Sequence, residues 1–152
     1  MPLPYEGARA GIKARDEITK ILRRFGCGSI GFMDDFSDQS VMLAFTVRDR
    51  KVQLRASAKG WAAAFLKENP WSYRRRGTQD QYKQKAIDQG LIAVNSILRD
   101  WVKGQITAVE TGILEFDAVF LPYMLMADGR PAIEHFENQL LLEAHSPTET
   151  KE

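Results

Sequence analysis

Hydrophobic residues recur at helical spacing near the start of the chain, and most of the polar positions between them are basic. The apolar positions are Ile12, Ile18, Ile21, Leu22 and Phe25. Apolar residues three and four apart line one face of a helix, and Gly26 follows where a C-cap glycine belongs. The pattern therefore predicts a helix over 8–25 that ends in a glycine turn.

Strict alternation of apolar and polar residues replaces this pattern over 28–58. The alternating apolar positions fall into three runs: Ile30 and Phe32; Val41, Leu43, Phe45 and Val47; and Val52, Leu54 and Ala56. A period of two is typical of half-buried strands. We predict a three-stranded antiparallel meander with one apolar face, which the flanking helices cover. The expected fold class is α+β.

Helical patterns return after the predicted sheet. A short helix over 60–67 is followed by a loop over 70–77. Thr78 and Gln81 have the spacing of a capping box, which begins a long amphipathic helix from about 79 to about 110. The apolar face of this helix carries Val94, Ile97, Leu98, Trp101, Val102, Ile106 and Val109.

The C-terminal third predicts shorter elements. Pro122 ends a short helix over 114–121, and a brief strand over 123–126 follows. Pro131 suits the first position of a final helix. The inward apolar positions expected on that helix are Ile133, Phe136, Leu140 and Leu141.

Length and composition indicate one ordinary domain. The chain has 152 residues, of which 44% are hydrophobic, enough to bury a core without covalent cross-links. We assign 1–145 to a single α+β domain and 146–152 to a disordered polar tail. The one cysteine, Cys27, excludes an intrachain disulfide and favours a reducing compartment. Because no apolar run is long enough to span a bilayer and no signal-peptide core precedes the first helix, we expect a cytoplasmic protein without a membrane partner.

Charge is segregated along the chain. Residues 1–103 carry 19 Lys and Arg against 11 Asp and Glu, a balance of +8, whereas residues 104–152 carry 2 against 9, a balance of −7. A sign asymmetry of this kind indicates an anionic partner for the basic part. The acidic part is either a surface for a basic partner or a counter-charge. Two charge poles on one chain also favour self-association into a homo-oligomer.

An aromatic and basic loop is the strongest local candidate for a binding site. Aromatic rings stack on bases, and guanidinium groups bind phosphate in bidentate fashion. The alternative is a solvated loop with its tryptophan packed over the core. The candidate residues of this loop and of the helix after it are Trp71, Tyr73, Arg74, Arg75, Arg76 and Lys83.

A second basic group falls on the predicted sheet. If Val52 and Leu54 point inward, Lys51 and Arg55 point outward. The candidate residues here are Arg48, Arg50, Lys51 and Arg55. If this face lies beside the loop, the two form one continuous basic groove for nucleic acid. The alternative is that the lysines and arginines protect an edge strand from aggregation.

No catalytic, metal or cofactor signature stands out. His135 and His145 are ten apart, so an unbroken helix places them about 15 Å from each other, too far to share a metal ion. Glu115 and Asp117 are two apart and face different ways on a helix. We predict no metal site, no cofactor and no catalytic residue. An enzyme is not excluded, but a non-catalytic protein is favoured.

Short motifs over most of residues 8–135 resemble a loose group of small proteins of bacteriophages and prophages. The motifs are Gly31-Phe32-Met33, Arg50-Lys51-Val52, Val109-Glu110-Thr111-Gly112 and the segment from Phe120 to Arg130. The resemblance implies a viral or mobile-element setting and hence the cytoplasm of a host cell. It implies no activity and no site residues.

Two functional hypotheses follow. The first is a non-catalytic phage-type protein that binds single-stranded or duplex nucleic acid in replication, recombination or regulation, and whose affinity falls steeply with salt. The second is an interaction module that inhibits a host enzyme or defence complex through its acidic C-terminal part.

Overall fold

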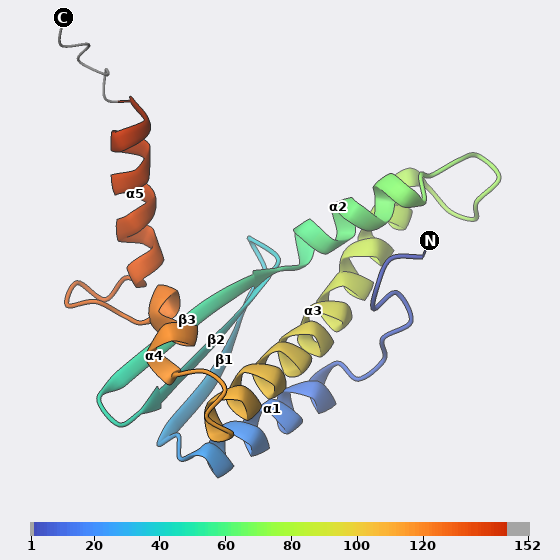
Figure 1. Ribbon diagram of the computed structural model, residues 1–152. Helices are drawn as coiled ribbons and strands as arrows, with labels where there is room; N and C mark the ends of the chain where they lie inside the picture. The colour runs from blue at the N-terminus through green and yellow to red at the C-terminus, as the bar shows by residue number, and fades with distance from the viewer. Residues whose placement is uncertain (1, 146–152) are drawn as a thin grey trace, which may run out of the picture.

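The computed structural model describes residues 2–145, which form a three-stranded antiparallel sheet and five α-helices (Figure 1). The predicted α+β fold with one long helix is therefore confirmed, whereas the predicted tail over 146–152 lies outside the described residues. The elements are α1 (Ile12–Phe25), β1 (Ser29–Asp35), β2 (Ser40–Val47), β3 (Arg50–Ser57), α2 (Ala58–Glu68), α3 (Gln79–Glu110), α4 (Phe116–Phe120), the 3-10 helix η1 (Leu121–Tyr123) and α5 (Ala132–His145).

The sheet is a meander in the order β1-β2-β3, and its two faces differ in burial. Leu43 on β2 pairs with Phe32 on β1 and Leu54 on β3, so these three side chains share the inner face. Helices α1 and α3 cover that face (Figure 1). The alternation of the sequence thus predicts correctly which residues enter the core.

The core lies between the sheet and the two covering helices. Ile18 and Leu22 of α1 are fully buried in this core, and aromatic rings from β2, α3 and α4 fill one end of it. There the ring of Phe120 packs edge-on against both Phe45 and Trp101, at centroid distances of 5.7 Å. Edge-to-face aromatic pairs add to the stabilisation from burial alone.

The long helix α3 begins as its capping box predicts. The backbone N–H of Gln81 donates to the hydroxyl of Thr78 (3.2 Å), and the N–H of Thr78 donates to the side-chain oxygen of Gln81 (3.0 Å). Further along, α3 approaches the start of α2 closely at Gly90. A Cβ atom at this position would lie 2.9 Å from the carbonyl oxygen of Ala58, so only glycine allows this packing.

A polar network ties α1, β1 and α3 together. The guanidinium of Arg15 forms an ion pair with Asp34 (2.5 Å) and donates through Nε to Oδ1 of Asn95 (2.9 Å), a buried residue of α3. The same guanidinium lies 5.3 Å from the centroid of the Phe32 ring. Because of the contact with Arg15, the pKa of Asp34 is lowered.

Two N-terminal boundaries differ from the sequence-based prediction. Helix α1 begins at Ile12, not at residue 8, because Gly11 takes a positive φ of 49° that lies outside the helical region. Strand β1 extends through Asp34 and Asp35 instead of ending before them, because Asp35 pairs in register with Ser40.

The C-terminal third also departs from the prediction. Pro122 lies inside η1, and the expected strand at 123–126 is reduced to isolated bridges, one of which pairs Met124 with Val52. Helix α5 stands away from the sheet (Figure 1), so that Ile133 and Phe136 are exposed and their predicted inward position is wrong. The structure describes the backbone but not the side chains of Leu140 and Leu141, which carried the same prediction.

Candidate nucleic-acid interface

The ten basic and aromatic candidates fall into two groups. Arg48, Arg50 and Lys51 lie at the β2–β3 hairpin and Arg55 near the other end of β3, whereas the remaining six lie in and after the loop that follows α2. The hairpin turn between β2 and β3 holds Arg48, whereas the loop after α2 holds Arg74 (Figure 1). Strand β3 spans about 26 Å and α2 about 16 Å more, given their 8 and 11 residues. The two groups therefore do not form one continuous groove.

At the β2–β3 hairpin, Arg50 forms an ion pair with an acidic residue. Its Nη2 and Nε atoms contact the two carboxylate oxygens of Asp117 at 2.8 and 3.1 Å. This contact raises the pKa of Arg50 and lowers the pKa of Asp117. Arg50 pairs with Val47 on the inner-face side of the sheet, so it is not part of the outward basic face.

A cleft of about 530 Å³ lies beside this ion pair. Its charged lining is mixed, because it includes Asp49 and Glu115 as well as Arg48. Arg48 itself is exposed and takes a φ of 52°, as the first residue of a tight two-residue turn. The mixed lining gives this cleft no preference for an anion.

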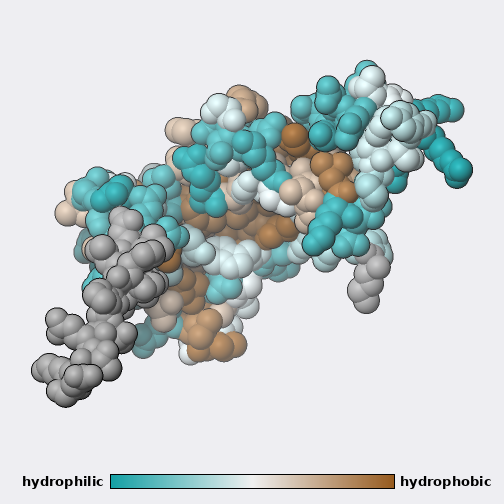
Figure 2. Space-filling model, turned by 90° about the horizontal axis from the view of Figure 1, so that it is seen from above, coloured by the Kyte–Doolittle hydropathy of each residue, from teal (hydrophilic) through white to brown (hydrophobic). Residues whose placement is uncertain are grey.

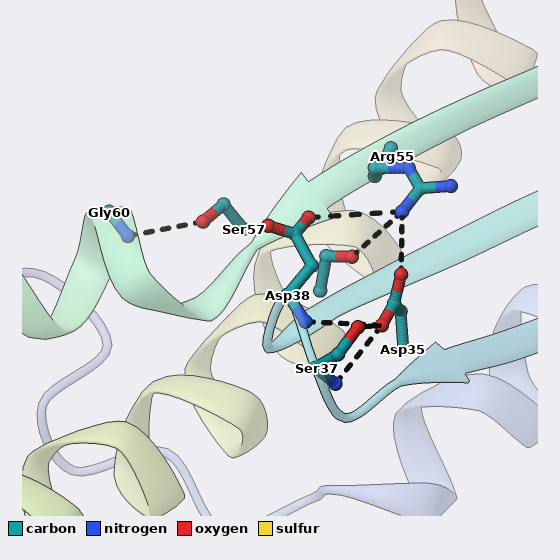
Figure 3. A network of polar contacts seen from close by, with 7 residues as sticks. Asp35, Ser37, Asp38, Arg55, Ser57 and Gly60 are labelled. Carbon is teal, nitrogen blue, oxygen red and sulfur yellow. Dashed lines mark hydrogen bonds and ion pairs between the residues drawn. The ribbon is translucent and has the colours of Figure 1, made fainter.

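On the outer sheet face, Arg55 is also held by acidic residues (Figure 3). Its Nη1 atom contacts Asp35 at 3.2 Å and Asp38 at 3.8 Å, and donates to the hydroxyl of Ser40 at 3.3 Å. Hydrogen bonds from the Ser37 hydroxyl and the Asp38 backbone, followed in size by that from Arg55, lower the pKa of Asp35. The network cancels the positive charge of Arg55.

Lys51 is the remaining outward cation of β3. Its side chain is exposed, and it pairs across the strands with Thr46. Gln53 separates it from the neutralised Arg55. One lysine beside neutral side chains does not make a basic sheet face, so the hairpin group contributes less charge than its sequence indicates.

The loop between α2 and α3 presents an aromatic pair. The rings of Trp71 and Tyr73 pack edge-on at 5.1 Å, and Tyr73 is 94% exposed. Trp71 is half-buried, and its indole Nε1 is a buried donor without a hydrogen-bond partner in residues 2–145. Trp71 therefore anchors the loop while Tyr73 stands in solvent.

The three consecutive arginines of this loop have different environments. Arg75 folds back: its guanidinium lies 4.8 Å from the centroid of the Tyr82 ring, and its Nε donates to the carbonyl of Pro70 at 3.2 Å. Arg74 and Arg76 are exposed, and in the described part of the chain neither forms an ion pair. The loop thus holds one structural arginine and two that point to solvent.

We call residues 67–85 the basic tip. It carries six Lys and Arg against two Asp and Glu, a balance of +4; the cations are Lys67, Arg74, Arg75, Arg76, Lys83 and Lys85. Hydrophilic side chains dominate this end of the molecule (Figure 2). The N-terminus of α3 also lies here and adds the positive end of a 32-residue helix dipole.

The acidic C-terminal residues serve in part as internal counter-charges. Besides Asp117, Glu110 lies 3.8 Å from Arg24, and Asp128 forms an ion pair with Arg130 (3.0 Å) and contacts Nε2 of His135 at 3.1 Å. Hydrogen bonds from the backbone and side chain of Arg130 lower the pKa of Asp128 to about 2. The pairing of Arg50 with Asp117 carries no local sequence signal, because the two residues are 67 positions apart.

Other kinds of site find little support in the structure. Within residues 2–145, no three His, Cys, Asp or Glu side chains gather in a way that could hold a metal ion. Burial raises the pKa of the Cys27 thiol to about 11, so little reactive thiolate forms at neutral pH. In the described part of the chain, no helix has the length and apolar character needed to cross a membrane.

Comparison with protein-family models, with curated proteins and with solved structures finds no match to this chain. The geometry of the two basic groups is therefore the main evidence for a function.

Proposed function

We propose that the protein is a non-catalytic nucleic-acid-binding protein and that it binds through the basic tip. The observation that carries this proposal is the combination of exposed Tyr73 with solvent-facing Arg74 and Arg76 on one loop. Binding to a phosphate backbone needs cations that are not already neutralised. The tip meets this condition, whereas Arg50 and Arg55 at the sheet do not.

Five residues of the tip have distinct roles in this proposal. Arg74, Arg76 and Lys83 contact phosphates, and the ring of Tyr73 stacks on a base. Arg75 is a positioning residue, because its contact with Tyr82 and Pro70 holds the loop in shape. Exposed stacking surfaces accept unpaired bases, so we expect single strands to bind more tightly than duplex.

A fluorescence-polarisation titration of labelled oligonucleotides, single-stranded and duplex, at two salt concentrations tests the proposal. The double variant Arg74→Ala/Arg76→Ala should weaken the binding of single-stranded and of duplex oligonucleotides. It should also make the dependence of log K on log salt less steep, by roughly 0.7 per lost phosphate contact on a single strand. Tyr73→Ala should weaken single-strand binding and leave the salt slope unchanged.

The matched control is Arg48→Ala/Lys51→Ala, which removes two exposed cations from the opposite end of the molecule. We expect it to bind as the unaltered protein does. Equal losses in the two double variants would assign binding to net charge alone. No binding at low salt would remove the proposed function and turn attention to the acidic C-terminal part.

The proposal extends to setting and location. We place the protein in the cytoplasm, and in a phage-infected host if the resemblance of the short motifs reflects its origin. That origin stays a prediction. The interaction-module hypothesis also stays a prediction. Three of the acidic residues on which it depends, Glu110, Asp117 and Asp128, already pair with cations of the same chain.

A further inference from the structure

The two edges of the sheet are protected very differently. At the β3 edge, Lys51 supplies an exposed charge, and the backbone N–H of Leu125 donates to the carbonyl of Lys51 at 2.8 Å. Charged side chains and a covering segment are two common ways to protect an exposed edge strand. At the opposite edge, β1 reads SIGFMDD, with no Lys, Arg or Pro, and among residues 2–145 no segment pairs with its outer side.

The strand register shows which backbone groups of β1 are unpaired. Val47 and Arg50 close a two-residue loop, and a closing pair of this kind exchanges both backbone hydrogen bonds. Hydrogen-bonding direction alternates along a strand, so the next residue, Lys51, directs its backbone outward. The hydrogen bond from Leu125 to Lys51 agrees with this assignment.

The same alternation applies on the other side of β2. Thr46 then directs its backbone toward β1, where it pairs with Ser29. Every second residue of β1 from Ser29 onward therefore directs its backbone groups toward β2. The residues between them, Ile30, Phe32 and Asp34, direct theirs away from the sheet. These three positions are symmetric about Phe32, and they present donors and acceptors in the order that an identical antiparallel strand requires.

We propose that β1 is a dimerisation edge, at which a second copy of this chain adds its own β1 antiparallel about a two-fold axis at Phe32. Ile30 of each copy then exchanges hydrogen bonds with Asp34 of the other. The result is a continuous six-stranded sheet with α1 of both copies on the same face. This proposal is independent of nucleic-acid binding.

Side-chain sizes along β1 suit this register. Met33 is 58% exposed on the outer sheet face, and the proposed pairing places it opposite Gly31 of the second copy. The space above Gly31 is open, since a Cβ atom there would meet nothing within 4 Å. Each Met33 therefore covers the glycine of the other copy, and two exposed apolar side chains leave water.

Exposed apolar residues continue beyond the strand. Phe36 follows β1 and is 84% exposed. The proposed register directs it toward Gly28 and the half-buried Cys27 of the second copy, where the glycine leaves room for an aromatic ring. A large apolar side chain in solvent thus gains a partner.

Charges on α1 are also self-complementary. Asp16 and Arg23 are seven residues apart and so lie on the same side of the helix. Both side chains are exposed, and neither forms an ion pair within residues 2–145. Since the two-fold axis runs the α1 helices antiparallel, Asp16 of each copy approaches Arg23 of the other.

Two double variants that differ only in the residue at position 31, a glutamate or a lysine, test the interface. G31E/M33E places glutamates opposite each other across the two-fold axis, whereas G31K/M33E places a lysine opposite each glutamate. Both sites are exposed, so both variants should fold, which circular dichroism verifies. Light scattering from roughly 1 µM to roughly 1 mM should show a dimer for the unaltered chain and for G31K/M33E, and a dimer dissociation constant at least about tenfold higher for G31E/M33E.

Amide hydrogen exchange gives a second readout. In the dimer, the amides of Ile30, Phe32 and Asp34 should exchange slowly, and in G31E/M33E they should exchange as fast as the outward amides of Gln53 and Arg55. The proposal is overturned by a monomer across the whole concentration range, by a dimer with fast-exchanging β1 amides, by a dimer that G31E/M33E leaves intact, or by a G31K/M33E variant as dissociated as G31E/M33E.

Discussion

Arg15 donates from Nε to Oδ1 of Asn95 at 2.9 Å, which joins α1 to α3 across 80 positions of sequence. Asn95 is only 6% exposed, and its amide nitrogen donates to the carbonyl of Leu91 within the helix. The side-chain oxygen depends on Arg15, because no other hydrogen bond to it is present among residues 2–145. Arg15 thereby stabilises the packing of both helices on the sheet.

Replacing Arg15 should therefore destabilise the fold. Arg15→Met leaves the Asn95 oxygen buried and unpaired, so we expect a loss of about 2 kcal/mol in the free energy of unfolding. Urea denaturation followed by circular dichroism measures this change. The control is Lys13→Met, a neighbouring exposed cation on the same helix, whose effect should stay within about 0.5 kcal/mol. Equal effects of the two variants would contradict the role of Arg15.

The Asp34 carboxylate should make stability depend on pH under acidic conditions. Arg15 lowers the pKa of Asp34 in the folded chain, whereas an unfolded aspartate titrates near about 3.9. The stabilisation is therefore fully present above about pH 4 and is lost as pH falls through the lowered pKa. Denaturation at several pH values should show that Asp34→Asn is less stable than the unaltered chain near neutrality.

That difference should shrink as the pH falls from about 4 through the lowered pKa of Asp34, because the carboxyl then becomes protonated and loses its charge in the folded chain as well. Asp49→Asn is the control, because Asp49 is exposed and forms no ion pair in the described residues. A difference between Asp34→Asn and the unaltered chain that stays constant down to the lowest pH would contradict the prediction.

Two glycines of α3 should respond oppositely to alanine. Gly90→Ala gains about 1 kcal/mol in helix propensity, but its Cβ would lie 2.9 Å from the carbonyl oxygen of Ala58. Relieving that overlap means moving α2, and overpacking of this kind costs about 1–3 kcal/mol. We expect a lower melting temperature.

Gly104→Ala is the matched case on the same helix, since nothing lies within 4 Å of its Cβ position. Only the gain in propensity, about 1 kcal/mol, should remain, and the melting temperature should rise. A rise for Gly90→Ala would show that α2 is free to shift away from α3.

The Arg50–Asp117 ion pair should contribute only weakly to the stability of the fold. Both side chains are about half exposed, and solvent screens such pairs strongly. In a double-mutant cycle with Arg50→Gln and Asp117→Asn, we expect a small favourable coupling at low salt that disappears at high salt. A coupling that high salt leaves unchanged would contradict the screened, exposed geometry.

Local patterns explain which parts of the fold could be predicted. The alternation of Val41, Leu43 and Phe45 reports a buried sheet face directly, because period two places them on one side. The capping box of Thr78 and Gln81 involves residues three apart, so the sequence alone locates the start of α3. Both predictions are confirmed by hydrogen bonds and burial.

Long-range pairing explains which parts could not be predicted. Arg50 and Arg55 are basic by residue type, but no local signal reveals that Asp117 and Asp35 neutralise them. Likewise, the apolar spacing of Ile133 and Phe136 describes a helix face without showing whether anything packs on it. The candidate interface was therefore overstated at the sheet, where tertiary contacts decide the net charge.

The protection of the β3 edge also sets how far assembly can proceed. If the β1 strands of two copies join, each chain contributes its open edge once, and what remains at both ends of the sheet is β3 with Lys51, Arg55 and the segment around Leu125. A further chain then meets only an edge that Lys51 and the segment around Leu125 already protect. The sheet is then self-limiting: growth terminates at two subunits instead of continuing into a fibre.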